Sequence, residues 1–306
     1  MLTALAGGVG AARFLAGLAA AVKPSTITAI VNTGDDFVLH GLAISPDLDT
    51  VTYTLAGEIN PDTGWGLRGE TWTVMAELAA RGGQAWFRLG DRDLATHLFR
   101  TQRRRDGAPL SRISAELAAS WGVGIRILPM SDETVETRVT VAGEGEIGFQ
   151  DYFVARGHGV AVTRLRFAGV EQAQPAPGVL DALADADRVI VCPSNPLVSI
   201  GPILAVPGIA EALGKRRDDT VAISPIIAGA ALKGPADRML RELGHEPSVV
   251  GVARLYAPLV GTLVIDTADA ERAGEVEAEG ISCVVAPTIM SGPAEAAALA
   301  RAVLAA

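Results

Sequence analysis

The sequence has few cysteines, no excess of basic residues and no long apolar run. Its two cysteines, Cys192 and Cys283, have neither metal-site nor redox spacing, so buried small side chains are the simplest interpretation. A net charge of −9 argues against broad electrostatic binding of nucleic acid. No apolar run reaches the length of a membrane span, and Arg13 interrupts the apolar N-terminus. We therefore expect a cytoplasmic protein without nucleic-acid or membrane partners.

The sequence also lacks the motifs of covalent nucleophilic catalysis. It contains no Gly-x-Ser-x-Gly elbow, no His-x-x-His pair and no persuasive Cys–His arrangement. What it does contain is 49% hydrophobic and 20% charged residues in a chain of 306, which is typical of a globular protein with a large core.

The order of apolar and helical segments predicts an α/β fold. Strands are expected at Leu2–Ala6 and Thr26–Val31, separated by a glycine turn and a helix over Ala11–Val22. Such a unit starts a Rossmann-like parallel sheet with helices on both faces. Further strands of this sheet are expected late in the chain, at Arg188–Cys192, Thr220–Ser224, Thr262–Asp266 and Ile281–Val285.

The middle of the chain has a different pattern. It is mainly helical up to about Pro129 and then forms three short strands with polar turns, at Glu136–Val141, Glu146–Phe149 and Val160–Phe167. We therefore predict a discontinuous α/β nucleotide-binding core of residues 1–46 and 172–306. Residues 47–171 are then a mostly helical insertion.

An acidic stretch follows the second expected strand. Asp35, Asp36, Asp47 and Asp49 are expected in the loop that leaves this strand, at the carboxyl edge of the sheet, where ligands of open α/β sheets bind. Aspartates also stabilise turns and cap helices. Because clustered carboxylates suit Mg²⁺, we favour a functional role for at least two of them, with Asp36 and Asp49 preferred.

A glycine turn comes directly after the first expected strand. Gly7, Gly8 and Gly10 would let backbone N–H groups approach a phosphate. The third glycine of the dinucleotide-binding pattern is replaced by Arg13, and Asn32 stands where a ribose-binding carboxylate is expected. A bound phosphate or a close packing contact is thus a better interpretation than NAD binding.

Three later residues are candidates for binding or structure. Arg88 has the charge to complement a phosphate or a carbonyl-rich ring, Asp91 is expected to cap the next helix, and His97 is expected to be a packed or surface side chain. Ser194 and Asn195 follow another expected strand, in a loop that prolines hold rigid. Polar residues in such a loop are typical of the rim of a nucleotide pocket.

Taken in order, these motifs resemble one family. Gly7–Gly10, Asn32–Asp36, Ser45–Thr50, Leu89–His97 and Pro193–Leu204 are arranged as in the CofD-type 2-phospho-L-lactate transferases of coenzyme F-420 biosynthesis. The resemblance implies a Mg²⁺-dependent transfer to the ribityl deazaflavin Fo from a GMP-linked three-carbon phospho acid, with release of GMP. It also implies a homodimer.

The resemblance further implies residue roles. Asp36 and Asp49 match the catalytic metal-binding aspartates, and Asp49 and Arg88 match the deazaflavin contacts, where some relatives have lysine in place of Arg88. The guanosine site would use Gly7, Gly8, Gly10, Ser194 and Asn195, and the insertion would contribute the deazaflavin site. The segment Gly64–Trp72 looks like that of bacterial members, whose donor can be phosphoenolpyruvyl instead of phospholactyl.

Two other functions remain open at this point. An NAD(P)-dependent oxidoreductase would need a nicotinamide cofactor and no metal. A non-enzymatic nucleotide-binding regulatory protein would bind nucleotide without turnover, and would leave the motifs around Asp49 and Asp91 unexplained.

Overall fold

A seven-stranded parallel sheet forms the centre of the protein. The computed structural model describes all 306 residues. Each strand is short and almost wholly apolar, as expected for strands covered on both faces. In spatial order the strands are β14 (Ser282–Val285), β13 (Thr262–Ile265), β10 (Thr220–Ile223), β9 (Arg188–Val191), β1 (Leu2–Ala6), β2 (Ile27–Val31) and β5 (Arg126–Pro129). This confirms the predicted α/β fold.

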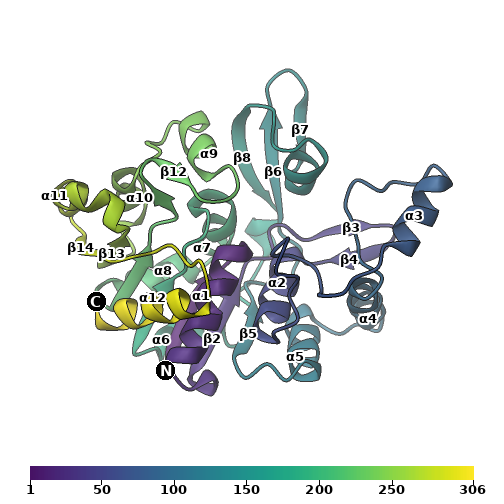
Figure 1. Cartoon of the computed structure of the whole chain (residues 1–306), viewed down its shortest axis with the longest axis horizontal. Helices are drawn as coiled ribbons and strands as arrows, with labels where there is room; N and C mark the ends of the chain where they lie inside the picture. The colour runs from purple at the N-terminus through teal and green to yellow at the C-terminus, as the bar shows by residue number, and fades with distance from the viewer.

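Helices cover both faces of the sheet (Figure 1). One face packs against α1 (Gly8–Ala21), α2 (Pro46–Leu55), α5 (Leu110–Ser120) and the C-terminal α12 (Pro293–Ala305). The other face packs against α6 (Val179–Ala184), α7 (Gly201–Ala205), α8 (Ile209–Gly214), α10 (Val249–Tyr256) and α11 (Ala273–Ala278). None of the helices is long and apolar enough to cross a membrane.

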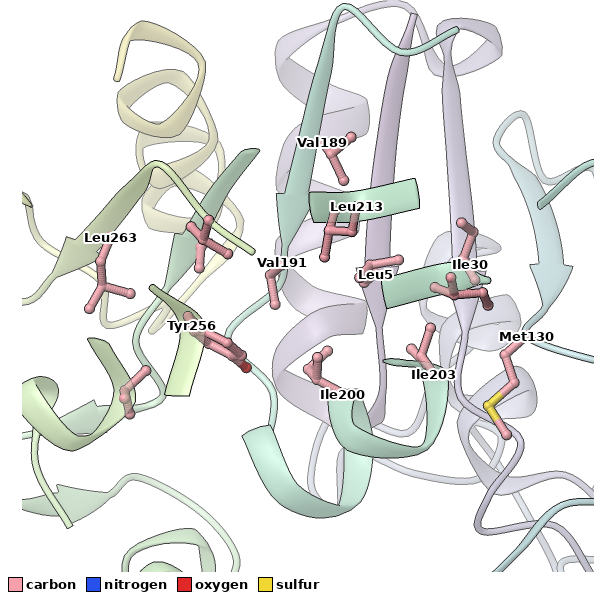
Figure 2. Close-up of a cluster of buried hydrophobic side chains, with 14 of the residues drawn as sticks. Leu5, Ile30, Met130, Val189, Val191, Ile200, Ile203, Leu213, Tyr256 and Leu263 are labelled. Atoms are coloured by element: carbon pink, nitrogen blue, oxygen red, sulfur yellow. The ribbon is translucent and has the colours of Figure 1, made fainter. Parts of the chain in front are cut away.

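The larger hydrophobic core lies on the second of these faces. Figure 2 shows Leu5, Val189 and Val191 on β1 and β9, with Val189 near Leu213 and the other two nearer to Ile200 and Ile203. All six side chains are buried. Because neighbouring parallel strands keep their side chains in register, this layer fixes the position of the loops at the strand ends.

Strand β5 lies within residues 47–171, the range predicted as an insertion. It pairs with β2 in parallel, with Ala29 opposite Ile127, and forms one edge of the main sheet. The chain therefore returns to the core between α5 and the small sheet that follows. The sequence analysis missed this strand because it is only four residues long and begins with an exposed arginine.

Two smaller bodies lie beside the main sheet, and one of them includes residues 37–44, which were predicted to belong to the core (Figure 1). One is the antiparallel sheet of β7 (Gly145–Gly148), β6 (Glu136–Val141) and β8 (Val162–Ala168), which confirms the three predicted short strands. The other contains the hairpin of β3 (Phe37–Leu39) and β4 (Leu42–Ile44) with α3 (Thr73–Ala80) and α4 (Asp93–Arg105). Helix α9 (Ala236–Glu242) packs beside β8.

Candidate functional site

The topology identifies where a ligand site is expected. From β1 the chain proceeds to β2 and β5 on one side, and later to β9, β10, β13 and β14 on the other. The strand order therefore reverses between β1 and β9. Ligands of open α/β sheets bind in the crevice outside the carboxyl ends of the strands at this position.

A cavity of about 820 Å³ lies at this position. Its lining comes from the turn after β1, the first turns of α2 and α4, the loop after β9, and the segments around Trp65 and Lys233. This volume is in the range of small-molecule sites. Of the residues predicted for the site, the cavity is lined by Gly7, Gly8, Gly10, Asp49, Arg88, Ser194 and Asn195.

In the glycine turn, Gly7 and Gly10 leave no room for a side chain, whereas Gly8 faces open space. A Cβ on Gly7 would lie 2.7 Å from Ser199 Cβ, and one on Gly10 would lie 2.6 Å from the carbonyl oxygen of Pro193. Both glycines are thus needed for close packing. Gly8 has φ +74° and nothing within 4 Å of its Cβ position, so its free side faces open space. Its N–H donates to Asp47 Oδ1 at 2.9 Å.

The loop after β9 is bonded directly to this turn. Ser194 Oγ donates to the carbonyl oxygen of Gly7 at 2.8 Å, and the Gly7 N–H donates to the same hydroxyl at 3.3 Å. Asn195 caps the following turn by accepting from the N–H groups of Leu197 and Val198. Both predicted rim residues therefore also have structural roles, and the geometry brings them together with the glycine turn as predicted.

The four aspartates are not all in one loop. Asp35 and Asp36 follow β2 in a turn, whereas Asp47 and Asp49 lie in the first turn of α2 and are buried. The prediction of a single acidic loop was therefore wrong. Carboxylates in the first turn of a helix are stabilised by the helix dipole, and proline is favoured at its first position, so the sequence Pro46–Asp49 favours a helix start.

Asp36 and Asp49 each keep one oxygen without a partner. Asp36 Oδ2 accepts from Ser45 Oγ at 2.6 Å, and Asp49 Oδ1 pairs with the guanidinium of Arg100. Asp36 Oδ1 and Asp49 Oδ2 are buried without a hydrogen bond. A buried carboxylate oxygen without a donor is unstable unless it binds a cation or a proton. This donor set fits the predicted metal-binding pair, although Asp36 does not line the cavity.

Burial raises the pKa values of the carboxylates at this site. Burial raises the pKa of Asp36 to about 8, against the hydrogen bond from Ser45. Burial also raises the pKa of Asp47 to about 6 and, together with the charge of Asp47, raises the pKa of Asp35 well above its usual value. A bound cation would reverse these shifts, because it favours the ionised forms.

Helix α4 presents a polar face to Asp49. The ring of His97 lies between two carboxylates, with Nε2 3.2 Å from Asp93 Oδ2 and Nδ1 3.7 Å from Asp49 Oδ2. Arg100, which is 1% exposed, donates to the Ala43 carbonyl at 3.2 Å and pairs with Asp49. Tyr53 donates to Asp93 Oδ1 at 2.7 Å. His97 is a packed side chain, which agrees with one of the two predicted interpretations, and it belongs to this polar network of Asp49, Asp93 and Arg100.

The sequence analysis named His97 but did not predict Asp93 and Arg100 as members of this site. Asp93, His97 and Arg100 are spaced at i, i+4 and i+7 in α4, so they share one helix face. A polar stripe of this kind beside an acidic segment was the available signal. His97, Asp93 and Asp49 bring ligand atoms within 4.8 Å of one another, and Arg100 pairs with Oδ1 of Asp49.

Arg88 lies in an aromatic part of the cavity wall. Its guanidinium carbon lies 4.2 Å from the centroid of the Trp72 ring, and Trp65, Trp86 and Phe87 line the cavity nearby. Such a contact restricts the guanidinium without removing its charge. The structure thus places Arg88 beside flat apolar side chains and away from the carboxylates of α2, with which it forms no ion pair.

The expected cap at Asp91 is formed on a different helix. Asp91 accepts hydrogen bonds from Thr71 Oγ1 and from the N–H groups of Thr73 and Val74, so it caps α3. Glu70 accepts from the N–H groups of Arg92 and Asp93 and caps α4. The prediction that Asp91 caps the helix following it was wrong, because the two helix starts exchange their capping carboxylates.

Comparison with known proteins decides between the remaining functional classes. The family described as 2-phospho-L-lactate transferase CofD matches residues 2–287. The chain belongs to the CofD family. It is therefore an enzyme of the transferase class, acting on a phospho-acid group, and not an NAD(P)-dependent oxidoreductase or a non-enzymatic regulator.

Relatives of similar length support this assignment. The chain is 49% identical over 305 residues to the phosphoenolpyruvate transferase of Streptomyces griseus, covering 98% of this chain and 96% of that one. It is 47% identical over 310 residues to the protein of that name from Kitasatospora aureofaciens, covering 99% and 97%. The match from Mycolicibacterium smegmatis is 44% identical over 316 residues, covering 98% and 97%.

Solved structures show the same fold. The protein BH3568 from Bacillus halodurans has a TM-score of 0.66 at 17% identity, covering 99% of this chain and 98% of that one. A second structure of that protein, described as a member of the UPF0052 family, has a TM-score of 0.62 at 18% identity, covering the same shares. At these identities the likeness concerns the fold alone.

Proposed function

We propose that this CofD-family transferase moves a phosphoenolpyruvyl or phospholactyl group from a GMP-linked donor to the deazaflavin Fo, in coenzyme F-420 biosynthesis. The observation that carries the proposal is that Asp36 and Asp49 each have a buried unpartnered oxygen, and that Asp49 lines a large cavity at the switch point of the sheet. The relatives named phosphoenolpyruvate transferase support the donor class.

The reaction requires positioning more than covalent help from the protein. The terminal ribityl hydroxyl of Fo forms a new O–P bond to the phosphorus that bears the three-carbon acid. The P–O bond to GMP breaks, the bridging oxygen stays on GMP, and the hydroxyl proton is released. Phosphoryl transfer depends mainly on alignment and charge compensation, which agrees with the absence of a nucleophile motif.

Asp36 and Asp49 would hold Mg²⁺ through their unpartnered oxygens. Bound there, Mg²⁺ would neutralise charge on the transferred phosphate. Ser45 and Arg100 keep the other oxygen of each carboxylate occupied, so both carboxylates have a fixed orientation. His97 and Asp93 hold this arrangement from α4.

We assign the two substrates to chemically different walls of the cavity. The aromatic wall with Arg88 suits a planar ring with carbonyl groups, so we assign Fo to this side and to Asp49. The turn of Gly7, Gly8 and Gly10 with Ser194 and Asn195 lines another part of the cavity, and we assign the guanosine side of the donor to it. The N–H groups of Gly7 and Gly8 already donate to Ser194 and Asp47, so the phosphates need other partners.

A competition between donors tests the proposal. The protein is incubated with Fo, Mg²⁺ and equal amounts of the guanylylated phosphoenolpyruvyl and phospholactyl donors, and the products are separated by mass, since they differ by two hydrogens. We expect both products, with the phosphoenolpyruvyl donor at least as good. A planar enol ester and a tetrahedral lactate differ little in volume, so discrimination should be about 1–3 kcal/mol. No product from either donor would refute the proposal.

A further inference from the structure

Three cationic side chains line the cavity, and two of them have no assigned role. These are Arg13 and Lys233; the third, Arg88, packs on Trp72. Neither Arg13 nor Lys233 has a carboxylate within ion-pair distance, whereas Arg100, Arg103 and Arg238 each have one. Two unpaired cations at one cavity therefore call for an anionic partner from outside the chain.

The acidic residues of the cavity do not supply that partner. Asp47 accepts from Gly8 and Asn32, Asp49 pairs with Arg100, and Asp93 accepts from Tyr53. None of the cavity's carboxylates pairs with Arg13 or Lys233, although Asp35 Oδ1 and Asp49 Oδ2 have no hydrogen-bond partner. The negative charges of the cavity therefore lie in one network and its free positive charges lie outside it. A ligand that carries negative charge along part of its length matches such a division.

Arg13 and Lys233 converge on the first turn of α1. Arg13 lies four residues after Val9 on the same face of the helix, and helix side chains lean toward the N-terminus, so Arg13 leans over the turn of Val9. A methyl group placed on Gly64 would lie 3.2 Å from Val9 Cγ1 and 3.7 Å from Lys233 Nζ. Lys233 Nζ and the Val9 side chain therefore lie near the same point, so Lys233 is close to that turn as well.

We propose that Arg13 and Lys233 bind the diphosphate of the donor at the first turn of α1. This inference rests on the proposed function, since it concerns the GMP-linked donor. A diphosphate presents oxygens in several directions, so a guanidinium and an ammonium that come from different elements can both bind it without competing for the same atoms. The two side chains come from residues 220 positions apart, so only the folded chain forms this clamp.

The test is a calorimetric titration with GDP and with guanosine. The proteins are the wild type, Arg13→Gln, Lys233→Gln and, as a matched control, Arg301→Gln. Arg301 is an exposed, unpaired cation on α12 that does not line the cavity. We expect Arg13→Gln and Lys233→Gln each to weaken GDP binding about tenfold or more, with guanosine binding unchanged and the control like the wild type. The loss should shrink as salt is raised.

The possible results separate the clamp from the proposed function. Wild-type affinity for GDP in both cavity variants would overturn the clamp and leave the proposed function standing. An equal loss for guanosine would also overturn it, because the cations would then support the whole pocket. A wild type that does not bind GDP would overturn the proposed donor and the clamp with it. Lys233 is exposed, so its substitution should not disturb folding, and thermal melting checks Arg13→Gln.

Discussion

Asp49 shows how one residue at this site can serve both the fold and the proposed reaction. One of its oxygens is buried without a hydrogen-bond partner, while its other oxygen pairs with the buried guanidinium of Arg100. A surface carboxylate could be removed with little effect on folding. Removal of Asp49 instead leaves a buried charge without a partner, which typically costs about 3–5 kcal/mol.

Substitution of Asp49 should therefore reduce both activity and stability. We expect Asp49→Leu to abolish transfer and to lower the free energy of unfolding by about 3–5 kcal/mol, measured by urea denaturation. The double variant Asp49→Leu, Arg100→Met should recover much of the stability but none of the activity. Recovery of turnover in the double variant would show that Asp49 is not needed for the reaction.

Asp36 gives the metal-free protein a dependence on pH. Its folded-state pKa of about 8 is above the ordinary value of 3.8, so the folded state binds the proton more tightly than the unfolded state. The resulting stabilisation is fully present below about pH 4 and is lost as pH rises through 8. Mg²⁺ should bind more tightly over the same rise, because it replaces this proton.

Thermal melting in the presence of a chelator measures this effect. Between pH 6 and pH 9 the midpoint of the wild type should fall more than that of Asp36→Asn, which has no proton to lose. The thermal midpoint of the variant will still fall somewhat as pH rises, because the pKa values of Asp35 and Asp47 are also raised. Parallel curves for the two proteins would contradict the assigned pKa of Asp36.

At the scale of elements, the exchanged caps connect α3 to α4. Glu70 belongs to the segment that precedes α3, yet it caps α4, whose first turn holds Asp93. Asp91 precedes α4, yet it caps α3. The two helices therefore hold each other in place through their first turns, and a change in one is transmitted to the other.

Loss of the Glu70 carboxylate should loosen the first turn of α4. We expect Glu70→Ala to cost about 0.5–2 kcal/mol locally and to increase hydrogen exchange at the amides of Arg92 and Asp93. Glu77→Ala is the matched control, since Glu77 forms only an exposed pair with Arg81 on α3. Equal exchange in α4 for the two variants would mean that the cap does not hold this helix.

At the scale of the whole molecule, the last helix, α12, packs against the first helix, α1. Helix α12 packs on α1 so tightly that a Cβ on Gly17 would lie 2.3 Å from the backbone carbon of Ala296. Figure 1 shows the two helices side by side on one face of the sheet. The C-terminus thus stabilises the unit that carries the glycine turn.

Gly17→Ala should destabilise the protein, although alanine favours helices. The added methyl would push α12 away from α1, at a cost of about 1–3 kcal/mol, which should lower the thermal midpoint. Gly274→Ala in α11 is the control, because nothing lies within 4 Å of its Cβ position. That change should be neutral or stabilise by at most about 1 kcal/mol. Similar effects at both positions would contradict the close contact.

The sequence alone determined the fold class of this protein and most strands of its main sheet. The apolar run, glycine turn and helix at the N-terminus are local patterns, and so are most of the later strands, because residue spacing decides which face of an element is buried. The ordered motifs also pointed to the family that the comparisons confirmed. The cytoplasmic location and the homodimer stay predictions.

The tertiary structure decided which residues meet. Arg100 reaches Asp49 across 51 positions, Ser194 reaches Gly7 across 187, and the caps of α3 and α4 are exchanged between segments. Strand β5 became part of the sheet by pairing with β2 rather than by its own short sequence. Such contacts depend on the path of the whole chain, because a local pattern specifies which face is buried but not the partner that covers it.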